Sequence, residues 1–153
     1  MHRTMNKIFP REASNHYQGY RIAAWVFLLI ASVEFVRSLI HIFAPDGGAG
    51  SIAGMDVSVP GGKGIIFALW GSAQLLEALI SLVVFFRYKT LIPFMYLYII
   101  AEYLLRIFVG HMKPVSFAHT PPGQIADYAM IPLALIMLVL ALLNRPGIKE
   151  MHD

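Results

Sequence analysis

Residues 22–43 read IAAWVFLLIASVEFVRSLIHIF, a stretch whose only ionisable side chains are Glu34, Arg37 and His41. At 1.5 Å per residue, a helix of this length reaches about 33 Å, enough to cross the roughly 30 Å hydrocarbon core of a bilayer. The spacing i, i+3 and i+7 places the three side chains on one face of that helix. Charges at such depth are costly, so they are usually paired and often mark a functional site. The stretch therefore predicts a membrane helix with one polar face.

Three further segments are long and apolar enough to cross a bilayer, namely 64–86, 91–110 and 125–143. The chain as a whole is 58% hydrophobic and only 14% charged over 153 residues, which is too apolar for an ordinary soluble domain. A soluble bundle would also need polar outer faces, and these segments offer almost none. The sequence predicts an all-α, integral membrane four-helix bundle, one domain over 1–153, in the cell membrane as a multi-pass protein.

The second and third spans also carry polar faces. The second has Trp70, Gln74 and Glu77 at i, i+4 and i+7, and the third has Tyr98, Glu102 and Arg106 at i, i+4 and i+8. Because polar faces in a bilayer turn towards one another, we expect them to form one cluster with the polar face of the first span. The candidates for acid–base catalysis are Glu77, Glu34 and His41, and the candidates for ligand binding are Arg37, Trp70, Gln74, Tyr98, Glu102 and Arg106.

A charge count within this cluster singles out Glu77. Three carboxylates meet two arginines, and arginine keeps its proton in proteins. Glu34–Arg37 and Glu102–Arg106 have same-helix pairing distances, which leaves Glu77 without a permanent cation. We expect Glu77 to hold a proton, or to be matched by His41, a cationic ligand or a metal.

The orientation follows from the basic residues outside the spans. Eight of them fall on one side and two on the other, which predicts that both termini are cytoplasmic. The eight are Arg3, Lys7, Arg11, Arg21, Arg87, Lys89, Arg145 and Lys149, and the two are Lys63 and Lys113. The net charge of +3 is thus explained by the basic residues that orient the spans in the membrane. The sequence has no basic surface interleaved with aromatic residues, so it implies no nucleic-acid partner.

The two halves of the chain resemble each other weakly. Tyr20-Arg21 matches Tyr88-Lys89, and Glu34 matches Glu102, all at an offset of 68 residues. This pattern favours two parallel helical-hairpin repeats related by an axis along the membrane normal, although chance alignment of apolar segments is an alternative. Repetition would place Glu34 and Glu102 opposite each other.

Metal and cofactor signals are weak. The chain has no cysteine, which excludes disulfide, iron–sulfur and zinc-thiolate chemistry. His41, His111 and His119 fall near the outer ends of spans or in an outer loop, yet none has a metal-binding spacing. The sequence therefore assigns no metal ligand, leaves open whether one of these histidines binds a metal, and identifies no cofactor. Asp127 is assigned to the first turn of the fourth span, where it would suit the helix dipole.

The architecture resembles the broad group of small bacterial four-helix membrane proteins that includes the DoxX-like and similar uncharacterised families. The likeness rests on four spans, cytoplasmic termini, a long Gly-rich first outer loop (residues 46–64) and polar residues in the first three spans. It implies, for some members, a role as membrane subunits of quinone-linked oxidoreductases. No diagnostic motif accompanies the likeness, so it assigns no functional residue.

Three functions remain open on the sequence. The first is binding of a small amphipathic or lipid-like ligand in the intramembrane Glu/Arg/His pocket, since pockets between helices are common ligand sites. The second is acid–base chemistry on a lipid-soluble substrate in the same pocket. The third is a structural or accessory role in a homo-oligomer or a larger membrane complex.

Overall fold

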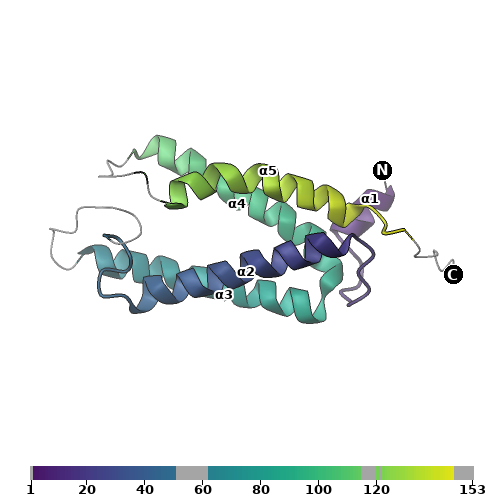
Figure 1. Cartoon of the computed structure of the whole chain (residues 1–153), viewed down its shortest axis with the longest axis horizontal. Helices are drawn as coiled ribbons and strands as arrows, with labels where there is room; N and C mark the ends of the chain where they lie inside the picture. Colours follow the sequence, from purple (N-terminus) through teal and green to yellow (C-terminus); the bar gives the residue numbers. More distant parts are fainter. Residues whose placement is uncertain (1, 51–61, 115–119, 121, 147–153) are drawn as a thin grey trace.

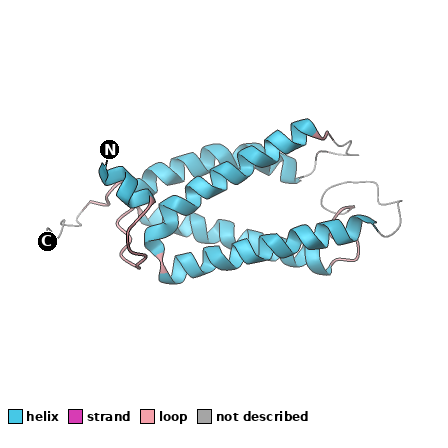
Figure 2. Ribbon diagram, turned by 180° about the vertical axis from the view of Figure 1, so that it is seen from behind, coloured by secondary structure: helices cyan, strands magenta, loops and turns pink. Residues whose placement is uncertain are grey.

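The computed structural model describes residues 2–50, 62–114, 120 and 122–146. The chain has four long helices. Figure 1 shows the long helices lying side by side, with a short helix near the N-terminus at one end. In chain order the elements are α1 (His2–Ile8), α2 (Arg21–Phe43), α3 (Gly62–Arg87), the 3₁₀ turn η1 (Lys89–Leu91), α4 (Ile92–Met112) and α5 (Pro122–Leu142). Figure 2 shows only helices and loops in this part of the chain.

The prediction of four long apolar helices is confirmed. Each of the four is long and apolar enough to cross a membrane, and no helix end differs from the predicted span by more than three residues. The largest difference is at α5, which begins at Pro122 and not at residue 125. Proline suits the first turn of a helix, because its missing N–H has no partner to lose there.

The long helices pack as two hairpins, α2 with α3 and α4 with α5. Within the first hairpin the two helices approach closely at Gly71. A side-chain carbon added there would lie 2.7 Å from the Cβ of His41 and 3.1 Å from the carbonyl oxygen of Ser38. The missing side chain of Gly71 is therefore what allows α2 and α3 to approach so closely.

The buried core lies in the half of the molecule near the termini. Phe27 and Tyr96 are fully buried there, and the Tyr96 hydroxyl donates a 2.6 Å hydrogen bond to the carbonyl of Ala23. The amide of Tyr20 donates to the carbonyl of Leu140 across the same interface. Towards the opposite end the two hairpins diverge, as Figures 1 and 2 both show.

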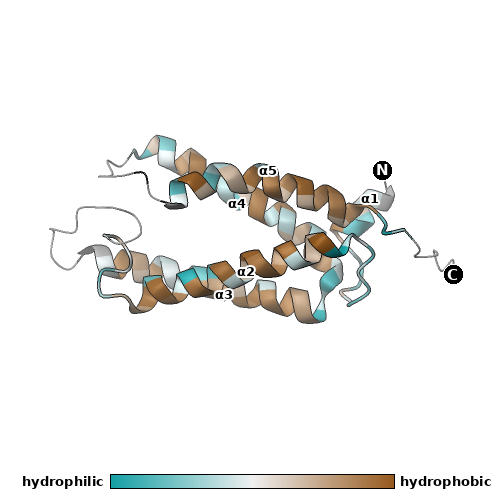
Figure 3. Ribbon diagram, viewed as in Figure 1, coloured by the Kyte–Doolittle hydropathy of each residue, from teal (hydrophilic) through white to brown (hydrophobic). Residues whose placement is uncertain are grey.

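The outward surface of the long helices is apolar. Figure 3 shows brown, hydrophobic residues along all four, with polar residues gathered at the ends and in short patches along the helices. Leu29 on α2, Leu76 on α3 and Leu105 on α4 are each more than 60% exposed. Large apolar side chains exposed in such numbers are unfavourable in water, so this surface fits contact with lipid.

The short helix α1 was not predicted. It is held at the terminal end by Lys7, whose ammonium group donates a 2.7 Å hydrogen bond to the carbonyl of Leu142. The chain then returns along that end, where Ser14 and Thr90 exchange two hydrogen bonds. This end of the molecule is thus an ordered cap over the start of α4 and the end of α5.

Candidate functional site

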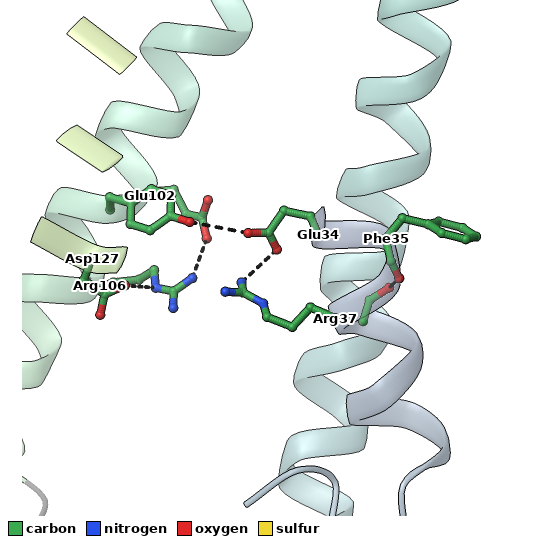
Figure 4. Close-up of polar contacts among 8 residues, drawn as sticks. Glu34, Phe35, Arg37, Glu102, Arg106 and Asp127 are labelled. Carbon is green, nitrogen blue, oxygen red and sulfur yellow. Dashed lines mark hydrogen bonds and ion pairs between the residues drawn. The ribbon is translucent and has the colours of Figure 1, made fainter. Parts of the chain in front are cut away.

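The polar face of α2 carries an ion pair near the level where the hairpins diverge. A terminal nitrogen of Arg37 lies 2.7 Å from a carboxylate oxygen of Glu34, one turn earlier in the same helix. Both side chains are less than one fifth exposed. Figure 4 shows this pair projecting from α2 towards α4.

Arg106 on α4 makes a second, larger arrangement opposite the first. Its Nη1 lies 3.4 Å from Glu102 on the same helix, and its Nε lies 3.0 Å from Asp127 on α5. Figure 4 shows the guanidinium groups of Arg37 and Arg106 pointing towards one another across the space between the hairpins. Arg106 therefore joins α4 to α5 and faces α2.

Tyr103 links the two arrangements. Its hydroxyl lies 3.4 Å from the free carboxylate oxygen of Glu34, so it donates a long hydrogen bond from α4 to α2. Next to this contact is a cavity of about 10 Å³, lined by Glu34, Glu77, Glu102 and Tyr103, by Ser81 and by apolar neighbours. A cavity of that size holds about one water molecule. Glu34 and Glu102 thus lie at one cavity.

Trp70 places an aromatic ring between the two arginines. The Cζ atom of Arg106 lies 5.3 Å from the centre of the Trp70 ring, and that of Arg37 lies 5.9 Å away. Both distances are within the range of cation–π attraction. Because Trp70 is 40% exposed, its ring is also available to another molecule.

His41 lies behind Trp70 rather than in the open part of the site. Its ring stacks on Trp70 at a centroid distance of 5.2 Å, and its side chain is only 3% exposed. Its Nδ1 lies 2.6 Å from the carbonyl oxygen of Gly47, so Nδ1–H donates there. His41 supports the ring of Trp70 and reaches the charged groups only through it.

Gln74 is buried without a hydrogen-bond partner in the described part of the chain. It is 3% exposed, and neither its amide nitrogen nor its amide oxygen is paired. It lies one turn from Trp70 and one turn from Glu77 on the same face of α3. A buried unpaired amide costs about 1–3 kcal/mol, so a water or a ligand group is expected to reach it.

We call the side chains that gather here the polar cluster. It has four carboxylates, one from each long helix, and two arginines. Four acids against two permanent cations leave two negative charges to be neutralised by protons or by a bound group. The polar cluster comprises Glu34, Arg37, Trp70, Glu77, Glu102, Tyr103, Arg106 and Asp127.

The structure brings most of the residues singled out in the sequence to this place. Tyr98, which is 42% exposed, lies beside the carboxylates of Glu77 and Glu102. His41 and Gln74 border the polar cluster from the buried side. The predicted candidates therefore lie together, while their roles in binding or catalysis stay predictions.

Sequence reasoning missed Asp127 and Tyr103. Asp127 was assigned to the first turn of its helix, and this is wrong, because α5 begins five residues earlier at Pro122. A signal was present in the lengths of the helices. Arg106 lies six residues before the end of α4 and Asp127 five residues after the start of α5, so the two lie at equal depth in the hairpin.

No group of three or more histidine, aspartate or glutamate side chains in the described ranges could hold a metal ion. His111 is exposed at the end of α4, where its Nδ1 donates to the carbonyl of Ile107 at 2.8 Å. His119 lies outside the described residues.

Comparisons of the chain with protein families, with curated proteins and with solved structures found no match. The small four-helix membrane architecture is supported by the four long apolar helices. The resemblance to DoxX-like proteins stays a prediction.

Proposed function

We propose that this membrane protein binds a small amphipathic or lipid-like molecule at the polar cluster. The observation that carries the proposal is the partial exposure of the charged side chains, between 18% and 24% in the two ion-paired groups, within an otherwise apolar surface. Ion pairs that only join helices need no opening to the surface. Partly open ones can exchange a hydrogen bond with a ligand head group.

The charge of the polar cluster favours a particular kind of head group. Two unmatched carboxylates favour a group that donates hydrogen bonds or carries positive charge. The exposed ring of Trp70 would attract the same kind of group through its negative face. The apolar part of the ligand would lie along exposed side chains such as Leu105 and Phe108 on α4, both at least 60% exposed.

We also propose the orientation and the repeat that the sequence predicts. The end with both termini would face the cytoplasm because it carries most of the basic residues. The start of η1 at Lys89 lies 68 residues after the start of α2 at Arg21, which is the offset of the proposed repeat. The two hairpins would then be related copies that contribute Glu34 and Glu102 to one site.

Acid–base catalysis in the same place is the second candidate. It is favoured by the position of Glu77, whose carboxyl lies beside those of Glu102 and Glu34 at a cavity of one-water size. Neighbouring carboxyls can share a proton and pass it to a substrate. His41 is a weaker acid–base candidate, because its ring is buried and its Nδ1 is held by Gly47.

A structural or accessory role is the remaining alternative. It is favoured by the ion pair of Arg106 with Asp127, which fastens α4 to α5. In that role the polar cluster would accept no ligand, and its variants would change stability alone.

The test is mass spectrometry of small molecules extracted from the purified protein. A substitution of Trp70 is compared with the same substitution of Trp25, which serves as the control. Trp70→Leu removes the ring at the polar cluster, whereas Trp25→Leu removes a ring that is 61% exposed on α2 and packs against Phe85. We expect one molecule to accompany the wild type and Trp25→Leu in near-stoichiometric amount and to be depleted in Trp70→Leu. Equal recovery of all extracted molecules from both variants would contradict ligand binding at the polar cluster.

A further inference from the structure

A second cavity lies at the terminal end of the molecule, far along the helices from the polar cluster. Its volume is about 180 Å³, more than ten times the roughly 10–15 Å³ that one water molecule needs. Its walls come from α1, from the return segment between α1 and α2, from η1, and from the start of α4 and the end of α5. Figure 1 shows these elements meeting beside the N-terminus.

The lining of this cavity is rich in hydrogen-bond donors. Among the lining residues that the structure describes, Asn6, Lys7, His16, Gln18 and Thr90 have polar side chains, and none is acidic. Lys7 brings a positive charge to the wall, where its ammonium group donates to the carbonyl of Leu142 and to the side-chain oxygen of Asn144. Donors without carboxylates are the chemistry that binds an anion.

The residues around the cavity, like Lys7 in its wall, carry mainly positive charge. Among the residues at this end whose side chains the structure describes, six are basic and one, Glu12, is acidic. Burial raises the pKa of the Tyr17 hydroxyl further above its ordinary value, so this lining residue adds no negative charge. The six basic residues are Lys7, Arg11, Arg21, Arg87, Lys89 and Arg145.

The depth of the cavity matches the edge of a bilayer. Gln18 and Thr90 lie within three residues of the helix ends at Arg21 and Arg87, and Ala141 is the next-to-last residue of α5. Beside the cavity, Phe9 packs on Phe94 of α4 at a ring distance of 5.7 Å. Both rings are exposed, Phe9 by 51% and Phe94 by 37%, so an apolar surface continues from the cavity along α4.

We propose that this cavity binds the phosphate head group of an anionic phospholipid from the leaflet at the terminal end. The lining donors would hold the phosphate oxygens, and the acyl chains would lie against Phe9, Phe94 and the length of α4. A free phosphate ion shares the head-group chemistry but not the apolar contact, so competition by inorganic phosphate distinguishes the two sources.

The test is native mass spectrometry of the full chain in detergent, titrated with dioleoyl phosphatidylglycerol or with dioleoyl phosphatidylcholine. We expect at least one phosphatidylglycerol to bind with about tenfold preference over phosphatidylcholine. Both lipids carry a phosphate, but only phosphatidylcholine carries a choline cation, which the basic residues around the cavity repel. Lys7→Gln should weaken the binding of phosphatidylglycerol by about the same factor. The control is Lys113→Gln, which removes one positive charge from an exposed residue at the opposite end and should change nothing.

Because Lys7→Gln could release α1 from α5, His16→Gln gives an independent measurement. His16 is an exposed residue of the return segment and belongs to no helix, and its replacement should weaken phosphatidylglycerol binding by roughly threefold if its ring contacts the phosphate. Equal binding of the two lipids would overturn the proposal, as would equal losses in His16→Gln and Lys113→Gln. Displacement of the lipid by millimolar inorganic phosphate would show a site for the free ion and would overturn the lipid assignment.

Discussion

Replacing Arg106 by methionine would remove the cation that two carboxylates share while keeping an apolar side chain of similar length. Glu102 lies 3.4 Å from Arg106 on the same helix, and Asp127 lies 3.0 Å away on α5. The substitution therefore strands two acids in a largely apolar setting. The matched triple variant Arg106→Met, Glu102→Gln, Asp127→Asn removes the charges of the whole group and strands none.

The expected loss follows from these distances and from burial. At an effective dielectric constant of about 20, the two pairs have gross Coulomb energies of roughly 4.9 and 5.5 kcal/mol. Desolvation cancels much of this, and removing one partner of a buried pair costs about 3–5 kcal/mol. Protonation at pH 7 limits the cost of a stranded carboxylate to about 4 kcal/mol. Glu102 and Asp127 are 24% and 20% exposed, which favours the lower end of this range. We therefore expect Arg106→Met to lower the free energy of unfolding by about 3 kcal/mol.

The assay is reversible unfolding in mixed micelles by titration with sodium dodecyl sulfate, followed by far-ultraviolet circular dichroism. The triple variant should recover most of the loss and lie within about 1 kcal/mol of the wild type. Arg37→Met strands only one carboxylate, that of Glu34, which still accepts the hydrogen bond of the Tyr103 hydroxyl. It should therefore lose less stability than Arg106→Met. Equal losses for Arg106→Met and the triple variant would refute the stranded-charge reasoning.

Three further predictions address the orientation, the protonation and the packing of the helices. Reporter fusions after Arg87 should be cytoplasmic and fusions within residues 46–62 external; cytoplasmic labelling of the latter would reverse the orientation. Glu77→Gln should keep stability within about 0.5 kcal/mol and remove a protonated carboxyl band from infrared difference spectra, whereas a band that persists unchanged would place the proton elsewhere. Gly71→Ala should destabilise the α2–α3 hairpin by about 1–3 kcal/mol, as measured by the same micelle titration. The control Gly110→Ala, where an added carbon meets nothing within 4 Å, should be neutral or stabilising by up to about 1 kcal/mol, and equal losses would show that close approach at Gly71 is not the cause.

The long helices could be predicted from the sequence because apolar length alone determines whether a segment can cross a bilayer. The gathering of Glu34, Glu77 and Glu102 could be predicted because helical spacing fixes which side chains share a face. Contacts between helices could not be predicted in the same way. Arg106 already had a plausible partner at i−4 in Glu102, so nothing in its own span indicated that Asp127 would also pair with it.

The terminal end shows a second limit of the sequence. Helix α1 has seven residues, too few for an apolar period to stand out and too few to be stable alone. It is held by contacts distant in the chain, such as Lys7 with the carbonyl of Leu142. Only the folded arrangement reveals these contacts and the cavity that they enclose.

The fluorescence of Trp70 tests the central claim, ligand binding at the polar cluster, most directly. The chain has two tryptophans, so Trp25→Phe leaves Trp70 as the sole reporter at the site, and Trp70→Phe leaves Trp25 as the sole reporter of the α2 surface. Delipidated protein of each kind is titrated with lipid extract from the cells that produce it. We predict a saturable change in the emission of Trp70 at an extract level that leaves the emission of Trp25 unchanged. Parallel changes in both variants, or no change at Trp70, would contradict the claim.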